Sequence, residues 1–97
     1  MYGTIARLQI KAGMEPRFQE MDREFEAAQV PGYVAQYVYR MDNEPNVYYL
    51  AVIFESKDAY VANANSPEQD ARFQAYSALL DSAPEWHDGE IVYSGKA

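Results

Sequence analysis

Apolar and polar positions follow two different periods in the first third of the chain. Residues 2–10 alternate between two faces, and a period of two residues is typical of a β-strand. One face of this predicted strand carries Tyr2, Thr4, Ala6, Leu8 and Ile10. After Gly13 the apolar positions fall three or four residues apart, which predicts an amphipathic helix over residues 14–29. Its apolar stripe contains Met14, Phe18, Met21, Phe25 and Ala28.

Two strands joined by a short turn are predicted next. Pro31 and Gly32 end the helix, because proline removes a backbone donor and restricts the residue before it. Residues 33–41 and 47–55 are rich in β-branched and aromatic side chains, and the intervening DNEPN has the composition of a hairpin loop. Apolar residues occupy consecutive positions in 47–55, so both faces of that strand are predicted to be buried. A helix layer covers one face only, and a second copy of the sheet would cover the other, which predicts a homodimer.

Two helices and a closing strand are predicted in the last third of the chain. Ser56 can cap a short helix over residues 57–64, and SPEQ then opens a longer helix with Ser66 as its N-cap. One face of the longer helix is expected to contain Phe73, Tyr76, Leu79, Leu80 and Ala83. The segment SAPEWHDG, residues 82–89, is interpreted as a connection, and EIVYSG, residues 90–95, as the closing strand.

The resulting order of elements, β-α-β-β-α-β, is that of the ferredoxin-like split βαβ fold. Residues 1–97 are therefore expected to form one α+β domain, a four-stranded antiparallel sheet with helices on one face. Right-handed crossovers would place the first and third strands in the centre of the sheet. No linker, internal repeat or low-complexity segment interrupts this pattern.

Composition narrows the classes of function. A net charge of −7 and a pI near 4.5 favour solubility and repel phosphate groups, so nucleic acid and anionic membranes are not expected as partners. The chain has no cysteine, which removes disulfides, thiol nucleophiles and cysteine-based metal sites. Without a signal pattern or a long apolar run, a cytoplasmic protein is expected. No metal site is predicted, and no glycine-rich loop points to a nucleotide cofactor.

Four local motifs carry a resemblance to a known family. They are PG before the second strand, an acidic turn containing Pro45, FESKDAY between strand and helix, and NSPEQ at the start of the longer helix. With these motifs the chain resembles the antibiotic biosynthesis monooxygenase family. The resemblance implies a dimeric α+β barrel, with a pocket in each protomer between sheet and helices. Some members of that family oxygenate aromatic polyketides or quinols without metal or flavin, so no cofactor is expected.

A haem-degrading branch of the same superfamily uses an Asn on the first strand, a Trp on the short helix and a His on the long helix. These positions fall at Ala6, Asn63 and Phe73 in this sequence, and none of the three residue types matches. Without an axial ligand at the matching place, a haem-degrading activity is not expected. Asn63 is still of interest, because it lies about one helical turn from Tyr60 and can face the same pocket.

Aromatic residues supply most of the candidate site. An aromatic lining with polar tips suits a phenolic or quinone-like ligand, through stacking and hydrogen bonding. The residues expected to contact the substrate are Tyr37, Tyr39, Tyr48, Phe73, Tyr76 and Trp86. The candidate catalytic residues are Tyr60, Asn63 and His87, as donors or proton carriers for an electron-rich phenolate that reduces O2. The alternatives are tyrosines that fill the core or the dimer interface, and a non-catalytic barrel that binds a small molecule or has a structural role.

The only tryptophan and the only histidine are neighbours, Trp86 and His87. Because they fall in the predicted connection before the closing strand, Trp86 is interpreted as a lid packed on the barrel end or against the partner. His87 is interpreted as a surface or rim residue, or as a proton carrier if its ring points into the tyrosine-lined space.

Overall fold

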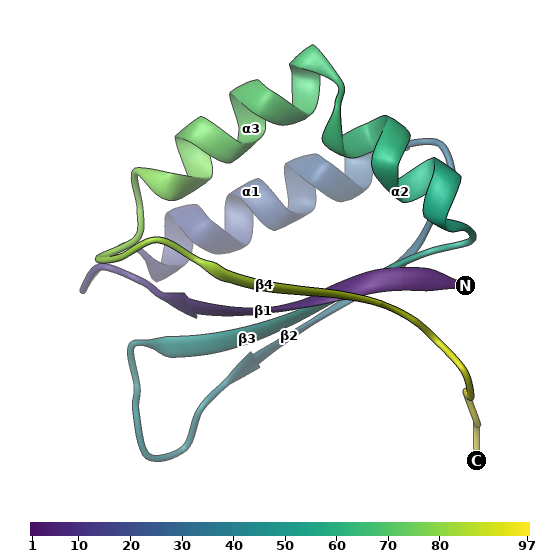
Figure 1. Ribbon diagram of the computed structural model, residues 1–97. Coiled ribbons are helices and arrows are strands. Elements are labelled where there is room, and N and C mark those ends of the chain that lie inside the picture. The colour runs from purple at the N-terminus through teal and green to yellow at the C-terminus, as the bar shows by residue number, and fades with distance from the viewer.

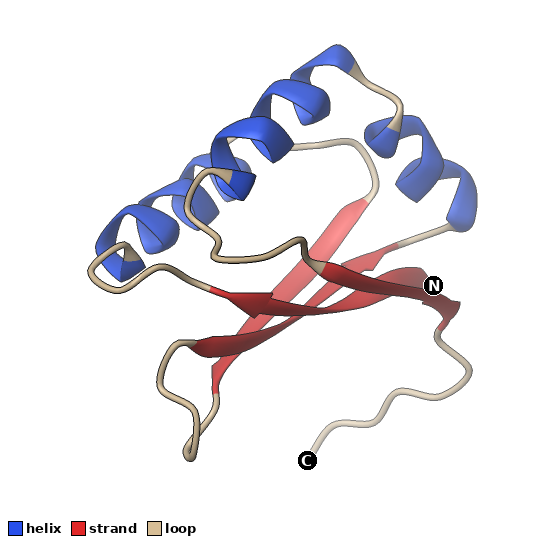
Figure 2. Ribbon diagram, turned by 60° about the vertical axis from the view of Figure 1, so that its left-hand side comes forward, coloured by secondary structure: helices blue, strands red, loops and turns tan.

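The computed structural model describes residues 1–97 as four strands and three helices. The strands are β1 (Tyr2–Gln9), β2 (Tyr33–Arg40), β3 (Val47–Phe54) and β4 (Glu85–Glu90). The helices are α1 (Glu15–Ala27), α2 (Lys57–Ala64) and α3 (Pro67–Ser77). All three helices lie over one face of the sheet, and the other face has no covering layer (Figure 1 and Figure 2). None of these helices is long and apolar enough to cross a membrane.

The sheet has the strand order β2-β3-β1-β4, and every neighbouring pair is antiparallel. The predicted ferredoxin-like α+β fold, with β1 and β3 in the centre, is therefore confirmed. Both helix caps inferred from the sequence are present as well. Ser56 Oγ accepts a hydrogen bond from Ala59 N, and Ser66 Oγ accepts one from Gln69 N, each at 3.1 Å.

The core lies between the helices and one face of the two central strands. Strand pleating places alternate residues on this face, as the period of two predicts. The core residues are Ala6, Leu8, Ile10, Phe18, Tyr48, Leu50, Val52, Phe54 and Leu80. The Phe18 ring of α1 packs against Tyr48 and Tyr76, with ring centres 5.7 and 5.1 Å apart. These contacts tie α1 to both the sheet and α3.

The closing strand differs from the prediction. It spans Glu85–Glu90, so most of the segment interpreted as a connection is the strand, and residues 91–97 continue beyond it without regular structure. β4 pairs with β1 over six residues along the edge of β1 that β3 leaves free. All of its residues are exposed and half of them are acidic, which suits an edge strand but gives no apolar pattern. Pairing with β1, rather than local propensity, makes this segment a strand.

Helix α3 is also shorter than predicted, because it ends at Ser77. Leu79, Leu80 and Ala83 therefore lie beyond the helix. Leu80 forms an isolated antiparallel bridge with Ile10, and both side chains belong to the core. The apolar residues after α3 are buried by extending the end of the sheet rather than by continuing a helical face.

The uncovered face of the sheet carries large apolar and aromatic side chains. Ile5 of β1 is 56% exposed, and Tyr37 and Tyr39 of β2 are 57% and 58% exposed. Each alternates along its strand with residues that face the helices. Apolar residues on both faces of the sheet are the feature on which the homodimer prediction depends.

Candidate functional site

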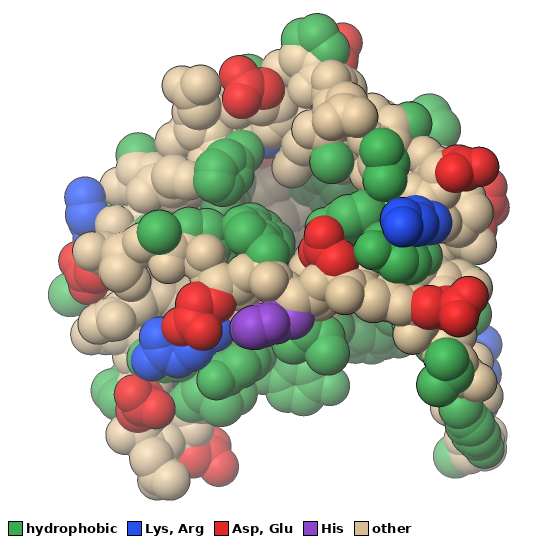
Figure 3. Space-filling view, viewed as in Figure 1, with side chains coloured by type: hydrophobic (Ala, Val, Ile, Leu, Met, Phe, Trp, Pro, Cys, Tyr) green, Lys and Arg blue, Asp and Glu red, His purple; other side chains and the backbone are tan.

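A pocket of about 430 Å³ lies between the helices and the sheet. All four strands and all three helices contribute residues to its lining. Figure 3 shows the hollow between the helix layer and the edge strand β4, which carries the only histidine. The volume lies in the range of small-molecule sites. Hydrophobic residues make up 10 of the 19 lining residues, so the pocket combines an apolar body with many polar contact points.

One row of residues across the sheet forms part of the pocket floor. From β2 through β3 and β1 to β4, the strand registers place side by side Gln36, Val52, Thr4 and Asp88. Adjacent strands lie about 4.8 Å apart, so this row is roughly 14 Å long. Polar groups lie toward its two ends, and the apolar residues Leu50, Val52 and Phe54 of β3 lie between them. The floor suits a flat ligand with an apolar body and polar groups near its ends.

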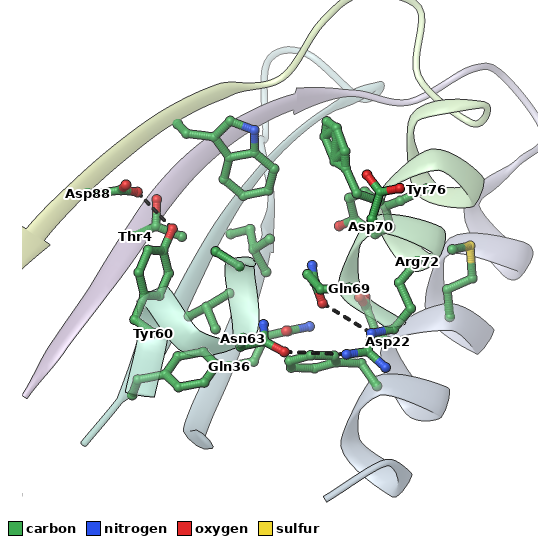
Figure 4. Close-up of a pocket in the computed structure, with 18 of the residues that line it drawn as sticks. Thr4, Asp22, Gln36, Tyr60, Asn63, Gln69, Asp70, Arg72, Tyr76 and Asp88 are labelled. Carbon is green, nitrogen blue, oxygen red and sulfur yellow. Dashed lines mark hydrogen bonds between the residues drawn. The ribbon is translucent and has the colours of Figure 1, made fainter. Parts of the chain in front are cut away.

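Tyr60 and Asp88 are paired at the β4 end of this floor. The Tyr60 hydroxyl donates to Asp88 Oδ1 at 2.8 Å (Figure 4). Burial raises the pKa of Tyr60 to about 12, and the Asp88 carboxylate adds to the rise, so the phenol stays protonated. Thr4 lies close enough to Tyr60 to lower that pKa slightly, yet its buried Oγ1 lacks hydrogen-bonding geometry to any partner. A buried hydroxyl without a partner is a group that a ligand can satisfy.

Arg72 is the one basic side chain in the lining, and three contacts fix it. Its Nη2 donates to Asn63 Oδ1 at 3.4 Å and its Nε donates to Gln69 Oε1 at 3.1 Å (Figure 4). Its guanidinium carbon lies 5.3 Å from the centre of the Phe25 ring, within the range of a cation–π contact. Because the Asn63 oxygen accepts from Arg72, the Asn63 amide nitrogen is left to donate to a ligand.

Asp22 and Tyr76 supply the polar groups toward the β2 end. Burial raises the pKa of the Asp22 carboxyl to about 6, against the opposing effects of the Gln36 amide and the Arg23 charge. The Tyr76 hydroxyl is buried and has no hydrogen-bond partner. Burial, and then the nearby Asp22 charge, raise the pKa of Tyr76. This end of the pocket therefore contains a titratable carboxyl and an unsatisfied hydroxyl.

The pocket is acidic apart from Arg72. Four carboxylates belong to its lining: Asp22, Glu24, Asp70 and Asp88. They come from α1, α3 and β4 and are spread around the pocket. No group of three or more His, Cys, Asp or Glu side chains lies close enough together to hold a metal ion. A negative lining disfavours anionic ligands, so the pocket suits an uncharged or cationic one.

The structure brings together five of the residues predicted for the site. The pocket is lined by Tyr60, Asn63, Phe73, Tyr76 and Trp86. Trp86 is 41% exposed, and its ring centre lies 6.2 Å from that of Phe73. Trp86 therefore lies where the pocket meets solvent.

Four other predicted residues lie outside the pocket lining. Tyr48 faces the helices but belongs to the core, where its hydroxyl donates to the Glu15 carboxylate at the start of α1. Tyr37, Tyr39 and His87 lie on the opposite face of the sheet, in register with Ala51, Tyr49 and Ile5 respectively. Side chains alternate between faces along a strand, so a neighbour of a pocket residue points away from the pocket. Alternation explains the placement of Tyr37, Tyr39 and His87, whereas Tyr48 lies on the pocket side of the sheet but fills the core.

Several lining residues were not predicted from the sequence. The polar ones among them include Thr4, Asp22, Gln36, Arg72 and Asp88. Two of them had a detectable signal, since Thr4 and Asp22 are polar residues within otherwise apolar faces of a strand and a helix. Asp88 had none, because the strand that carries it was interpreted as a loop. Recognising Gln36 and Arg72 requires the spatial arrangement of β2 and α3.

Comparisons with known proteins agree with this fold. Residues 1–76 match the family described as antibiotic biosynthesis monooxygenase, and no curated protein matches significantly. The fold is similar to that of the N63A mutant of SnoaB, a cofactor-independent oxygenase from Streptomyces nogalater. That comparison has 19% identity, covers 96% of this chain and 94% of that chain, and has a TM-score of 0.81.

Two further solved structures have the same fold. A protein assigned to the antibiotic biosynthesis monooxygenases from Caulobacter crescentus CB15 is 21% identical over 95% of this chain and 90% of its own, with a TM-score of 0.80. A conserved protein from Methanosarcina mazei Go1 is 17% identical over 91% of this chain and 89% of its own, with a TM-score of 0.77. At these identities the likeness to the solved structures is one of fold.

Proposed function

The chain belongs to the antibiotic biosynthesis monooxygenase family, and from this premise we propose that it is a cofactor-independent monooxygenase acting on a small aromatic substrate of the phenol or quinol type. The pocket between sheet and helices carries the proposal, because aromatic walls and hydrogen-bond donors converge in it. SnoaB, which is similar in fold, is a cofactor-independent oxygenase and supports the same class of reaction for this chain.

In the proposed reaction the substrate supplies the electrons. A phenol with a free ring position opposite its hydroxyl becomes a quinone at the expense of one O2. The hydroxyl and that ring carbon each lose a hydrogen, one oxygen atom becomes the new carbonyl, and the other leaves as water. All four electrons that reduce O2 come from the phenol. The protein's contribution is then to bind, orient and ionise the substrate in a site shielded from water.

The pocket residues match these tasks. Phe73 and Trp86 provide an aromatic wall on which a flat ring can stack. Tyr60 donates its one proton to Asp88 and can accept a hydrogen bond from a ligand, and the amide nitrogen of Asn63 is available as a donor. The Arg72 charge, fixed beside Asn63, favours negative charge developing on a bound phenolate.

We also propose that the open face of the sheet pairs with a second copy of the chain. Ile5, Tyr37 and Tyr39 are each more than half exposed on that face, and the family resemblance implies the same pairing. Light scattering coupled to size-exclusion chromatography should give twice the chain mass of 11.1 kDa. A monomer at every concentration tested would contradict the pairing.

Oxygen uptake tests the proposed reaction. The purified chain is incubated in an oxygen electrode with a panel of phenols and dihydroxynaphthalenes that carry a hydrogen opposite a hydroxyl, and autoxidation without protein is subtracted. At least one substrate should be consumed with one O2 taken up per molecule oxidised. Asn63→Ala should lower that rate by roughly a hundredfold, because it removes a donor and loosens Arg72. No uptake above the autoxidation rate with any of these substrates would overturn the proposal.

The same panel distinguishes the non-catalytic alternative. Trp86 is the only tryptophan and lines the pocket, so its fluorescence reports on occupancy. Phenols that quench Trp86 without causing oxygen uptake would indicate a small-molecule-binding protein instead.

A further inference from the structure

Asp22 differs from the other three carboxylates of the pocket. Each of the others accepts a hydrogen bond from a side chain. Asp88 accepts from Tyr60 at 2.8 Å, Asp70 from Gln74 at 3.4 Å and Glu24 from Arg17 at 3.0 Å. Asp22 takes part in no ion pair and accepts no side-chain hydrogen bond, although the nearby Gln36 amide lowers its pKa. It is thus the pocket carboxylate with most of its hydrogen-bonding capacity unused.

The position of Asp22 on α1 directs it toward the pocket. It lies in the apolar stripe of the helix, between Phe18 and Phe25, and next to the buried Met21. A helical residue in that stripe lies over the sheet rather than in solvent. Asp22 is half-buried there and lines the pocket together with Gln36 of the floor. A carboxylate placed among core residues without a partner is a costly feature for the fold alone.

A second unsatisfied group lies near it. The buried Tyr76 hydroxyl has no partner, and it is close enough to feel the Asp22 charge. A phenolic hydroxyl of a ligand is both a donor and an acceptor, so it can donate to Asp22 and accept from Tyr76 at once. One ligand hydroxyl would therefore satisfy the Asp22 carboxylate and the Tyr76 hydroxyl together.

We propose that Asp22 is the proton acceptor of this pocket, and that Asp22 and Tyr76 together bind the substrate hydroxyl that is ionised. The substrate O–H bond breaks, a carboxylic O–H bond forms on Asp22, and the electron pair stays on the substrate oxygen. Tyr76 keeps its own proton and donates to the phenolate. The proposal rests on the proposed function for the oxidation that follows, but the binding of a hydroxyl by Asp22 is testable without it.

The groups that face Asp22 leave it ionised near neutral pH. Burial raises its pKa to about 6, Gln36 of β2 and Arg23 of α1 lower it, and Tyr33 of β2 and Tyr76 of α3 lie near enough for its charge to act on them. Both tyrosines have raised pKa values and stay neutral in this range. A base with a pKa close to the working pH is suited to proton abstraction.

Binding of an unreactive phenol tests the role without any turnover. The full chain is titrated with 4-methylphenol, which stays uncharged between about pH 5 and about pH 8, and Trp86 fluorescence reports occupancy. The wild type should bind roughly tenfold more tightly at the higher pH, because an ionised carboxylate accepts a stronger hydrogen bond than a protonated one. Asp22→Asn should lose this pH dependence, and Asp22→Glu should keep it.

A matched control lies on the same helix. Glu26 lies about one turn from Asp22, is exposed and does not line the pocket. Glu26→Gln removes one negative charge, as Asp22→Asn does, and should behave as the wild type does. Circular dichroism confirms that each variant is folded. A pH dependence that survives Asp22→Asn, one that disappears equally in Glu26→Gln, or the absence of any 4-methylphenol binding to the wild type would overturn the proposal.

Turnover gives an independent reading once a substrate is found. The rate should fall below about pH 6 in the wild type as Asp22 becomes protonated, and Asp22→Asn should lower kcat/KM by roughly a hundredfold and remove that acid limb. If no substrate consumes O2 but binding remains linked to Asp22, the proposed oxygenase function fails and the hydroxyl-binding role of Asp22 is retained. If O2 is consumed and Asp22→Asn leaves the rate and its pH profile unchanged, the role of Asp22 fails and the oxygenase function is retained.

Discussion

The two ends of the pocket floor differ in whether their polar side chains are hydrogen-bonded to each other. At the β4 end, a tyrosine hydroxyl and a carboxylate satisfy each other, because Tyr60 donates to Asp88 at 2.8 Å. At the β2 end, the Tyr76 hydroxyl has no hydrogen-bond partner, and the nearby Gln36 amide only lowers the pKa of Asp22. The two pairs have the same chemistry, a phenol and a carboxylate, but only the pair near solvent is closed. The difference separates groups that stabilise the protein from groups available to a ligand.

The unpaired groups of Asp22 and Tyr76 lower the stability of the protein without a ligand. Burying a polar group without a partner costs free energy, whereas a paired group recovers most of that cost. A protein selected for stability alone would place apolar residues at 22 and 76, as it does at Met21 and Leu80. The contrast predicts that changes at the β2 end stabilise the fold while impairing binding, and that changes at the β4 end destabilise the fold.

Replacing the half-buried Asp22 should have the largest effect on stability. The pKa of Asp22 is raised from 3.8 to about 6, so the folded state disfavours the charged form. Its contribution to stability is therefore complete below pH 3.8 and is lost as the pH rises toward about 6. After a discount for partial exposure, Asp22→Asn should raise the free energy of unfolding by about 1.5 kcal/mol at about pH 8, and by much less at about pH 4.

Urea denaturation at the two pH values measures this difference. Comparison of variant with wild type cancels the titration of the other carboxylates, which both chains share. Glu26→Gln again serves as the control, because it removes one charge from the same helix at an exposed position. A destabilised Asp22→Asn at the higher pH would show that the carboxylate is well paired in the empty protein.

Removing the unpaired hydroxyl should have the next largest effect. Tyr76→Phe keeps the ring contact with Phe18 at 5.1 Å and deletes only the buried oxygen without a partner. The free energy of unfolding should rise by about 1 kcal/mol, because an unsatisfied polar atom is removed from the core. Affinity for 4-methylphenol should fall in the same variant. Loss of stability would mean that the hydroxyl is satisfied in solution.

The closed pair should show a smaller effect of opposite sign. Tyr60→Phe breaks the hydrogen bond to Asp88, and the exposed Asp88 remains hydrated, so unfolding should become easier by about 0.5 kcal/mol. Asp88→Asn and the double variant complete a cycle that isolates the pair. A coupling free energy near zero would show that this hydrogen bond contributes nothing to the stability of the fold. The β4 end would then not differ from the β2 end in this respect.

The sequence predicts the fold much better than it predicts the pocket lining. Alternation in β1 and the stripe of α1 depend on local periodicity, which a single chain displays directly. Strand β4 could not be found this way, because EWHDGE is held in the sheet by pairing with β1 and is exposed along its whole length. The more hydrophobic segment after it, IVYSG, forms no strand.

The same error moved a candidate catalytic residue to the wrong face. In a loop, neighbouring Trp86 and His87 can point the same way, but in a strand they cannot. Asp22 is missed for a different reason. A single carboxylate in an apolar stripe becomes a candidate only when the structure shows that no basic or donor group pairs with it. Whether a polar side chain has a hydrogen-bond partner depends on the tertiary structure. This property distinguishes the lining residues with a proposed role from those that fill space.

His87→Ala should have the smallest effect of all. His87 pairs with Ile5 on the open face, while its neighbours Trp86 and Asp88 point into the pocket. If the polar groups at the two ends of the floor account for binding, removing an exposed imidazole from the other face should change 4-methylphenol affinity less than twofold and unfolding free energy by no more than about 0.5 kcal/mol. Trp86 remains in place, so the same fluorescence titration measures the result. A large loss of affinity in His87→Ala would mean that β4 presents its opposite face to the ligand. Asp88, and with it the Tyr60–Asp88 hydrogen bond, would then not belong to the pocket.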